Sequence, residues 1–305
     1  MSKNIIVVGS SNTDMIIKLD HIPRPGETIL GGEFVTAAGG KGANQAVGAA
    51  RAGGKVTFIA RVGRDMFGDQ AVAGFVKEGI NTDHVSRDTS KPSGVALIFV
   101  AKDGENSIAV AGGANNGLSP ADVKKAKNVF AGADMLIMQL ETPLDTVQAA
   151  ADLAAQAGVL VILNPAPALA LPDKLLRRVS SITPNESEAE RLTGIKVSNT
   201  QTAAKAADKL LACGVKTVII TLGSRGAFVV GDGVRKLVPG FKVKAVDTTA
   251  AGDTFNGALA VALVEGTTLE NAVRFANAAA ALSVTRLGAQ TSVPTRNEIE
   301  KLLKE

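Results

Sequence analysis

The sequence predicts an α/β fold in which a Rossmann-like, mostly parallel central sheet has helices on both faces and carries a small antiparallel β lid. Three observations support this prediction. Short apolar runs alternate with Ala-rich helical patterns along most of the chain, which is typical of a parallel sheet with helical crossovers. Two stretches contain pairs of strands with no helix between them, and the C-terminal third is helical.

The predicted core strands are short apolar runs without polar alternation, which indicates burial on both faces. They are residues 5–9, 56–60, 135–140, 159–163 and 217–222. The predicted helices have apolar residues at helical spacing. They are residues 42–51, 146–157 and 202–211, followed by 255–263, 272–280 and 296–305.

The lid is predicted from strand pairs that leave no room for a helical crossover. The first pair is residues 15–19 and 29–35, and the second is 94–100 and 107–110. Asp103-Gly104 between the second pair is a hairpin signal. We therefore expect a discontinuous lid of residues 13–37 and 94–113, and a nucleotide- and substrate-binding core of residues 1–12, 38–93 and 114–305.

Composition argues against several classes of function. The net charge is +4 with dispersed basic residues, and the chain has no Trp or Tyr, so we expect no nucleic-acid binding. A single cysteine excludes an intrachain disulfide and fits a reducing, cytoplasmic location. The two histidines are not in a metal-ligand pattern, and no apolar run approaches the length of a membrane span.

The most informative motif is residues 247–255, where small residues lead into an apolar-periodic helix. The first turn of a helix offers free N–H groups and the positive end of the dipole, which together bind anions. Asp253 within that turn would repel a phosphate. It is either a general base that takes the proton from an attacking hydroxyl, or a carboxylate that merely complements the helix dipole.

A second loop leads into a helix at residues 39–46. It is neither a Walker A loop nor a dinucleotide fingerprint, because the required Ser or Thr and the third Gly are missing. Its Gly pair presents backbone N–H groups and Asn44 adds a polar side chain, which suits a polyhydroxyl ligand. The alternative is a tight turn before an ordinary helix.

Two further motifs are consistent with a nucleotide and its metal. Asn185 and Glu188 share one face of a helix start, where they either contact Mg²⁺ or cap the helix. Residues 221–226 follow a strand, so they contact a nucleotide phosphate, form a plain turn into a return strand at 227–230, or do both. Asp14 and Glu141 follow apolar runs at predicted strand ends, where ligands bind in α/β sheets, although either could be a surface carboxylate or helix cap.

Taken together, these motifs resemble the ribokinase-like, or PfkB, family of carbohydrate kinases. The family signatures match residues 39–44 with those that follow, and residues 247–255, where the Gly252-Asp253 pair is highly specific. The resemblance covers essentially the whole chain, from residues 9–14 to 288–294. Within the family, segments 40–46, 139–141, 164–167 and 183–186 are most similar to members that phosphorylate ribose.

The resemblance implies ATP-dependent phosphorylation of D-ribose at the 5-hydroxyl, giving D-ribose 5-phosphate and ADP. It assigns Asp253 as the base and the N–H groups of Ala250, Ala251 and Gly252 as an anion hole. The implied sugar-binding residues are Asn12, Asp14, Gly40, Lys41, Asn44 and Glu141. The implied ATP-binding residues are Asn185, Thr221, Gly223, Ser224, Gly226 and Asn277, with Glu188 organising Mg²⁺ through water. Implied positions for a K⁺ activator are Asp247, Thr249, Ser283, Arg286, Gly288 and Ser292.

The resemblance also implies a homodimer whose lid strands clasp, and a lid that closes over the sugar and excludes water. Two other functions remain as alternatives: a kinase of the same family for deoxyribose, fructose, a sugar acid or a nucleoside, and a non-catalytic sugar-binding regulator on the same fold. Intact Asp253, Gly252 and Asn185 argue against the regulator.

Overall fold

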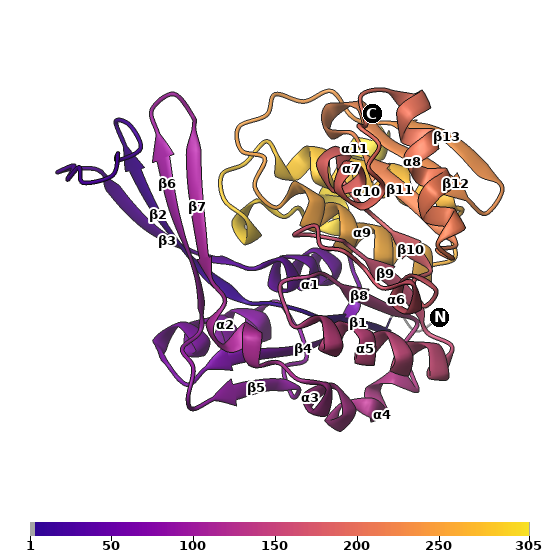
Figure 1. Ribbon diagram of the computed structural model, residues 1–305, viewed down its shortest axis with the longest axis horizontal. Helices are drawn as coiled ribbons and strands as arrows, with labels where there is room; N and C mark the ends of the chain where they lie inside the picture. The colour runs from indigo at the N-terminus through magenta and orange to yellow at the C-terminus, as the bar shows by residue number, and fades with distance from the viewer. Residues whose placement is uncertain (1–3, 305) are drawn as a thin grey trace.

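The computed structural model describes residues 4–304 and shows a larger α/β body from which a smaller sheet projects (Figure 1). Residues 1–3, assigned above to the core, and Glu305, the last residue of the last predicted helix, lie outside the described residues. Within residues 4–304, every helix is too short or too polar to cross a bilayer.

The main sheet of the described chain has nine strands in the order β13-β12-β11-β10-β9-β8-β1-β4-β5. The strands from β11 to β5 pair in parallel, while β12 and β13 pair antiparallel at one edge. Their bounds are β1 Asn4–Val8, β4 Lys55–Gly63, β5 Val85–Asp88, β8 Met135–Met138, β9 Leu160–Leu163, β10 Ser181–Ile182, β11 Thr217–Thr221, β12 Gly226–Gly231 and β13 Val234–Pro239. The predicted mostly parallel sheet is confirmed, including the return strand after residues 221–226.

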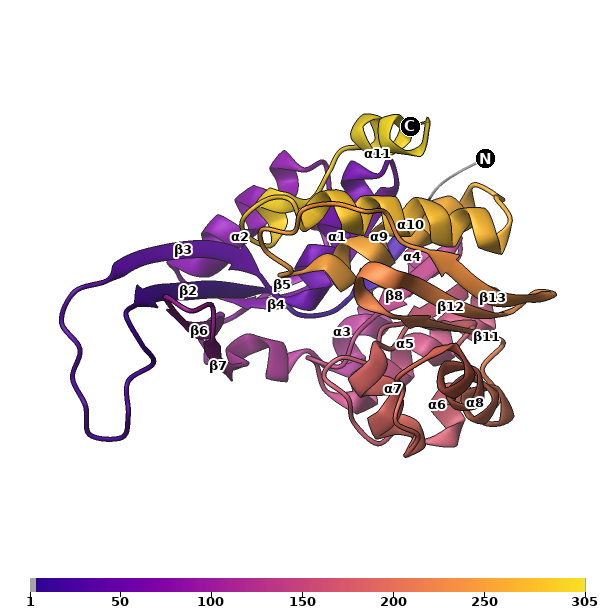
Figure 2. The ribbon, with the colours of Figure 1, turned by 90° about the horizontal axis from the view of Figure 1, so that it is seen from above.

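Helices cover both faces of this sheet and enclose two apolar cores, one on each side (Figure 2). On one face lie α1 Lys41–Arg51, α2 Met66–Lys77, α9 Ala251–Val264, α10 Leu269–Ser283 and α11 Arg296–Lys304. On the other lie α3 Pro120–Lys125, α4 Lys127–Phe130, α5 Leu144–Ala157, α6 Asp173–Leu176, α7 Glu186–Thr193 and α8 Thr200–Ala212. Short 3₁₀ turns occur at η1 Gly113–Gly117, η2 Gly223–Arg225 and η3 Gln290–Ser292. Ala and Gly at the helix contacts let the helices approach closely, which compensates for the scarcity of aromatic side chains.

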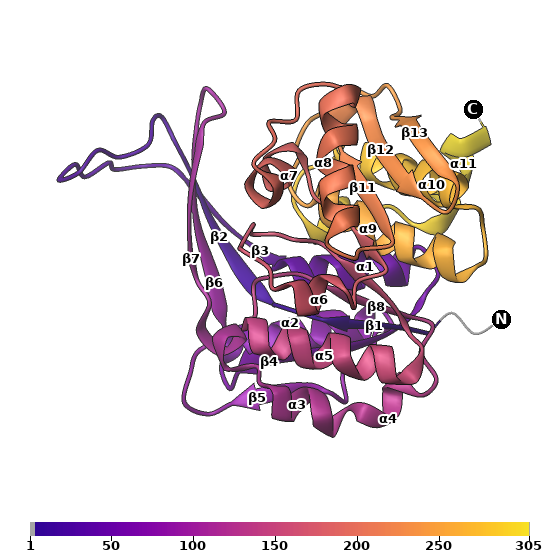
Figure 3. The same cartoon turned by 45° about the vertical axis from the view of Figure 1, so that its right-hand side comes forward.

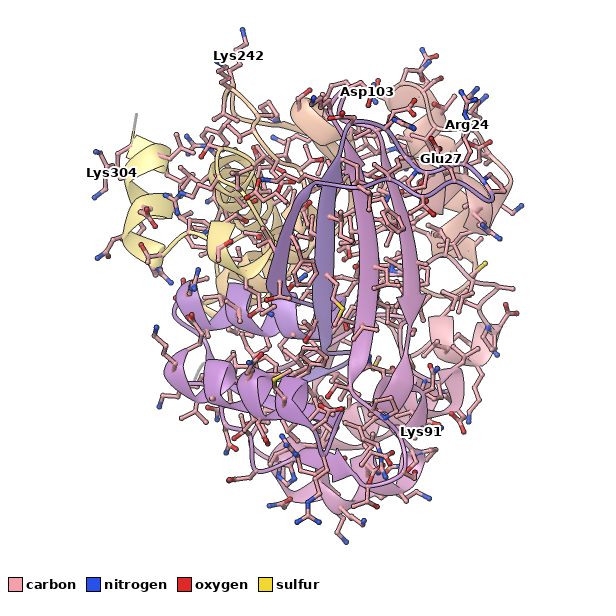
Figure 4. All side chains as sticks on the ribbon, turned by 90° about the vertical axis from the view of Figure 1, so that its left-hand side faces the viewer. Arg24, Glu27, Lys91, Asp103, Lys242 and Lys304 are labelled. Carbon is pink, nitrogen blue, oxygen red and sulfur yellow. The ribbon has the colours of Figure 1, made fainter. Side chains whose placement is uncertain are left out.

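The smaller sheet has the order β3-β2-β6-β7 and stands away from the body (Figure 3). Its strands are β2 Asn12–Leu19, β3 Glu33–Gly39, β6 Gly94–Ala101 and β7 Asn106–Ala111. The pairs β2–β3 and β6–β7 are antiparallel as predicted, while β2 and β6, which join them, run parallel. The tips of both strand pairs, marked by Arg24, Glu27 and Asp103, lie at one end of this sheet, far from Lys91 at its base (Figure 4).

The predicted strand at residues 29–35 is wrong in its position. Residues 29–32 are not in a strand, and β3 instead runs over Glu33–Gly39. Gly31 and Gly32 have φ of 96° and 111°, in the left-handed region that interrupts an extended strand. The strand therefore begins only after this pair and carries the chain directly to the loop at Gly40.

Candidate active site

Asp253 lies in the first turn of α9, inside the protein. The residue before the helix, Ala250, adopts the left-handed conformation with φ of 57°, which turns the chain sharply into α9. Asp253 is only 6% exposed, and burial raises the pKa of its carboxyl, although Lys41 and two amide donors oppose the shift. A carboxylate of this kind holds a proton more readily than a surface aspartate, as a general base near neutral pH requires.

Helix α1 brings the Gly-Gly loop against this carboxylate. Asn44 Nδ2 donates to Asp253 Oδ2 at 3.0 Å, and Gln45 Nε2 donates to Asp253 Oδ1 at 2.9 Å. The helices approach so closely because Gly257 of α9 packs on α1: a Cβ at Gly257 would lie 2.5 Å from the backbone N of Ala49. The two motifs, more than 200 residues apart in sequence, thus form one site.

The loop before α1 needs glycine for its shape and its contacts. Gly40 has φ of 88°, and a Cβ there would lie 2.6 Å from the backbone N of Asn12. The carboxyl of Asp14 lies against the neighbouring Gly39, where a side chain would displace it. Burial and the nearby carboxylates of Glu141 and Asp253 raise the pKa of Asp14 to about 6.

Glu141 and Lys41 complete this side of the site. Glu141 Oε2 accepts from the hydroxyl of Ser10 at 2.5 Å and from the backbone N–H of Lys41 at 3.0 Å. Burial would lower the pKa of Lys41, but the surrounding carboxylates, led by Asp253 and Glu141, raise it overall. The lysine is therefore a cation whose charge is favoured by several nearby carboxylates.

Asn12 is oriented by a residue from the chain after β7. Asn115 Nδ2 donates to Asn12 Oδ1 at 2.7 Å, and Asn115 also binds both backbone groups of Ser11. The Asn12 amide nitrogen is thereby turned away from Asn115. This contact links the base of the second strand pair to the first residue of β2.

A polar pocket opens on the other side of Asp253, at the start of α9. Its lining residues share short side chains or polar atoms. They are Lys41, Asn164, Ala166, Thr183, Asn185, Glu188, Thr221, Thr248, Ala250, Ala251, Gly252, Asp253 and Asn256. In the described chain, the N–H groups of Ala250 and Gly252 have no backbone acceptor, while that of Ala251 makes only a long turn contact of 3.3 Å to Thr248 O. These N–H groups are available to an anion in the pocket.

Asn185 and Glu188 form a capping box at the start of α7. Asn185 Oδ1 accepts from the N–H of Glu188 at 2.8 Å, and Glu188 Oε2 accepts from the N–H of Asn185 at 2.9 Å. The capping interpretation of this motif is therefore confirmed. Burial raises the pKa of Glu188, and because both residues also line the pocket, the cap does not exclude contact with a hydrated metal.

Other predicted nucleotide residues gather beyond this pocket, where β12 and β13 meet. Gly223 and Gly226 have φ of 58° and 99° and shape the turn after β11, with Ser224 between them. Gly226 pairs with Pro239, and Asn277 Nδ2 donates to the carbonyls of Val238 and Pro239 at 3.2 and 3.1 Å. Thr221 lines the pocket itself.

The predicted cation residues lie on two segments, 247–249 and 283–292. Asp247 links the two segments by hydrogen bonds. Its Oδ1 accepts from the N–H of Thr249 at 2.9 Å and its Oδ2 from that of Gly288 at 2.8 Å. Burial would raise the pKa of this carboxyl, but hydrogen bonds from the Thr249 side chain and from these two N–H groups lower it overall. Arg286 turns its guanidinium to Glu298 at 2.5 Å. The hydroxyls of Ser283 and Ser292 donate to the carbonyls of Ala280 and Ala289.

Several polar residues of this site were not identified as functional from the sequence. They are Ser10, Gln45, Asn115, Gln139, Asn164, Thr183 and Asn256. All seven are nearly or fully buried. Each of them hydrogen-bonds either a predicted site residue or another of the seven. Polar residues inside apolar or Ala-rich segments are the sequence feature that could have indicated them, because buried polar groups need partners.

Fold and site together define the class of protein. A buried carboxylate stands between an anion-binding helix start and a cluster of amide and carboxyl groups suited to a polyhydroxyl ligand. The protein is a phosphotransferase that acts on an alcohol group.

Comparison with known proteins gives the family. The model of the pfkB family of carbohydrate kinases matches residues 2–296, and the chain belongs to this family. It is 49% identical over 304 residues to the ribokinase of Haemophilus influenzae, covering 100% of this chain and 99% of that protein. Two solved structures are similar. The ribokinase of Thermotoga maritima has a TM-score of 0.91 and 44% identity, covering 99% of each chain. Arabidopsis thaliana ribokinase complexed with ribose and ATP has a TM-score of 0.92 and 36% identity, covering 100% of each chain.

Proposed function

We propose that this carbohydrate kinase transfers the γ-phosphoryl group of ATP to the 5-hydroxyl of D-ribose, giving D-ribose 5-phosphate and ADP. The observation that carries the proposal is the position of Asp253, buried at the anion-binding start of α9 and hydrogen-bonded to Asn44 of the Gly-Gly loop helix. The ribokinases similar to this chain over its full length, one of them complexed with ribose and ATP, support this choice of substrates.

Asp253 acts as the general base. The 5-hydroxyl gives its proton to the carboxylate as its oxygen forms a bond to the γ-phosphorus, and the bond from that phosphorus to the β-phosphate oxygen breaks. ADP leaves with the electron pair, and Asp253 is left protonated. The N–H groups of Ala250, Ala251 and Gly252 hold the charge of the transferred group, which is the main task of a phosphotransferase.

The sugar lies on the Gly-Gly loop side of Asp253. Asp14 and Glu141 accept hydrogen bonds from hydroxyls, while Asn12, Lys41 and the N–H of Gly40 donate to them. Asn44 borders the sugar beside Asp253, to which its Nδ2 donates. Polar groups that a missing hydroxyl leaves unpaired discriminate strongly against a sugar that lacks it.

ATP occupies the pocket at the start of α9 and extends past Asn185 and Thr221 toward the turn between β11 and β12. Gly223, Ser224 and Gly226 leave room there for the nucleotide, with Asn277 behind them. The carboxylate of Glu188 lines the phosphate end and suits a hydrated divalent cation. Mg²⁺ bound there would neutralise charge on the phosphates.

A monovalent cation, K⁺, fits the segments joined by Asp247. Each Asp247 oxygen accepts one N–H bond and retains a lone pair. The remaining ligands would be carbonyl and hydroxyl oxygens from Thr249, Ser283, Arg286, Gly288 and Ser292. Asp247 is the one carboxylate in this donor set, which suits a singly charged ion. K⁺ there would stabilise the loop that presents the anion hole.

The projecting sheet, residues 13–37 and 94–113, serves as a lid and as the contact surface of a homodimer. It exposes large apolar side chains on β3, β6 and β7, including Phe34 at 60%, Leu97 at 46% and Ile108 at 56%. Exposed apolar strands need cover. Light scattering checks this: the chain should be a dimer, and Ile108→Lys should make it monomeric. A monomeric wild-type protein would contradict the assignment.

The single cysteine fits a cytoplasmic enzyme.

An ADP-release assay over a panel of sugars tests the proposed function and its alternatives. Fast turnover with ribose supports it. Preference for deoxyribose, fructose, a sugar acid or a nucleoside would assign the chain to another substrate within the family. Ribose binding without ATP turnover on any sugar would instead favour a non-catalytic regulator.

A further inference from the structure

A continuous chain of buried side-chain hydrogen bonds lies behind Asp253, on the side away from solvent. Gln45 Nε2 bonds both Asp253 Oδ1 at 2.9 Å and Asn164 Oδ1 at 3.0 Å, and Gln45 Oε1 accepts from Gln139 Nε2 at 2.7 Å. Asn164 Nδ2 then donates to the carbonyl of Thr183 at 3.3 Å. Gln45 is fully buried, so it cannot touch the sugar.

The chain continues back to the helix start. The hydroxyl of Thr183 donates to Asn256 Oδ1 at 2.7 Å, and Asn256 Nδ2 donates to the carbonyl of Gly252 at 2.8 Å. Gly252 directly precedes Asp253. The carboxylate and the backbone of the anion hole are therefore connected through one hydrogen-bonded network anchored on α1, α9 and the ends of β9 and β10.

Two backbone carbonyls determine the direction of every bond in this network. A carbonyl oxygen can only accept. Because Asn164 must turn its NH₂ to Thr183 O, its Oδ1 faces Gln45. Gln45 must therefore present its NH₂ to Asn164, and the same NH₂ faces Asp253. At the other end, Gly252 O holds the Asn256 amide in the matching orientation.

The two oxygens of Asp253 consequently differ. Oδ1 faces an amide that cannot rotate without placing oxygen against oxygen at Asn164. Oδ2 faces Asn44, whose own Oδ1 has no partner in the described residues. The Asn44 amide can therefore rotate and accept from a protonated Oδ2 at little cost. A proton on Oδ1 would instead face the N–H of Gln45, and these two buried donors would both lack an acceptor.

We propose that Gln45 is a positioning residue that keeps Oδ1 of Asp253 as a permanent hydrogen-bond acceptor, so that Oδ2, beside Asn44, receives the proton of the sugar hydroxyl. This inference rests on the proposed function and deepens it. The hydroxyl proton passes to Oδ2 as the phosphorus–oxygen bond forms, and Asn44 rotates to accept from the new O–H. Gln139 and Asn164 hold the Gln45 amide throughout.

Other charged groups face Asp253 and set the background against which Gln45 acts. Lys41 at the start of α1 favours the ionised carboxylate, while Glu141 after β8, Asp14 of β2 and Glu188 of α7 oppose it. Gln45 adds a neutral donor, which favours the ionised form without adding a charge.

The test compares Gln45→Met with the wild type and with Gln148→Met, a matched change on α5 near Asp152. In Gln45→Met, kcat should fall about tenfold to hundredfold, the range expected for a lost hydrogen bond to a charged group. The acid limb of the kcat–pH profile should move to higher pH, because loss of the donor raises the pKa of Asp253. The Kd for ribose should remain unchanged. Gln148→Met should match the wild type.

The outcomes separate this inference from the proposed function. Absence of turnover in the wild type would overturn both. An active wild type together with a Gln45→Met variant that retains kcat and its acid limb would overturn the positioning role alone. An equal fall in the Gln148→Met control would attribute the loss to general destabilisation and would also overturn it.

If Gln45→Met does not fold, the wild-type protein provides the measurement. A crystal structure with ribose and a non-hydrolysable ATP analogue should place the 5-hydroxyl oxygen within hydrogen-bond distance of Oδ2, with Gln45 still bound to Oδ1. A hydroxyl on Oδ1 with Gln45 displaced overturns the inference.

Discussion

Replacing Asp253 by Asn removes the proton acceptor while keeping the shape of the side chain. Asp253→Asn retains one oxygen, which can still accept from Gln45. Its new NH₂ faces Asn44, which can rotate to present its unpaired Oδ1. The local hydrogen bonds can therefore re-form, and the change should act on chemistry far more than on structure.

The magnitude follows from the role of the carboxylate. General-base catalysis contributes about 10²–10⁴-fold, so kcat should fall at least about 10²-fold. The thermal stability of Asp253→Asn, in contrast, should equal or exceed that of the wild type. Burial raises the pKa of Asp253 in the folded protein, so its ionised form costs stability as the pH rises from the unfolded pKa through the folded one. An uncharged Asn avoids that cost, and the variant should unfold at pH 7 at the same temperature as the wild type or higher.

Three measurements check this prediction: ADP release at saturating substrates, calorimetric titration with ribose, and thermal unfolding. Ribose binding should survive, because the other sugar contacts remain. Asp173→Asn, at an exposed position at the start of α6, is the control and should retain full activity. Near-normal turnover by Asp253→Asn would refute the base assignment, whereas low turnover with lost folding would refute the argument that the network tolerates Asn.

Three further predictions concern the sugar pocket, the cation and the helix contact. Because the pKa of Asp14 is raised to about 6, the KM of the wild type for ribose should rise as the pH falls below 6. The KM of Asp14→Asn should be high at every pH. A wild-type KM that is independent of pH would contradict this prediction. Replacing K⁺ by tetramethylammonium should lower kcat, and in Asp247→Ala the kcat should be the same with either ion. Full wild-type activity without K⁺ would argue against the cation site. Gly257→Ala should lower the free energy of unfolding by about 1–3 kcal/mol in denaturant titrations, because the new Cβ meets the backbone of Ala49. Gly74→Ala is the control and should not lower it, because the Cβ there meets nothing. Equal stability of the two variants would show that α1 and α9 can separate freely.

The order of strands and helices follows largely from local patterns in the sequence. Apolar runs and Ala-rich helices predict the parallel sheet, and the Asp103-Gly104 hairpin lies where it was expected. The sequence pattern places the beginning of β3 too early, because the left-handed backbone of Gly31 and Gly32 cannot be read from composition. The two-residue strand β10 is too short to show any periodicity, and the charged strand β13 resembles a loop.

The site was predictable where a motif is local and not where it depends on tertiary contacts. Asp253 stands out because a carboxylate at a small-residue helix start conflicts with anion binding. Gln45 does not stand out, since a glutamine in an Ala-rich helix is also an ordinary surface residue. Its partners Asn164 and Asp253 are 119 and 208 residues away, so its role becomes visible only when α1 packs on α9. The pairing of Asn12 with Asn115 is likewise a tertiary contact.

In the proposed reaction, Asp253 takes the proton of the ribose 5-hydroxyl as that oxygen bonds to the γ-phosphorus of ATP. Phosphorus NMR of a reaction containing the chain, ribose, ATP, Mg²⁺ and K⁺ measures this most directly, since it identifies both the product and the position of the phosphate. The expected products are ribose 5-phosphate and ADP in equal amounts, and Asp253→Asn should form almost none of either. Phosphate on another hydroxyl, or inorganic phosphate with no sugar phosphate, would contradict it.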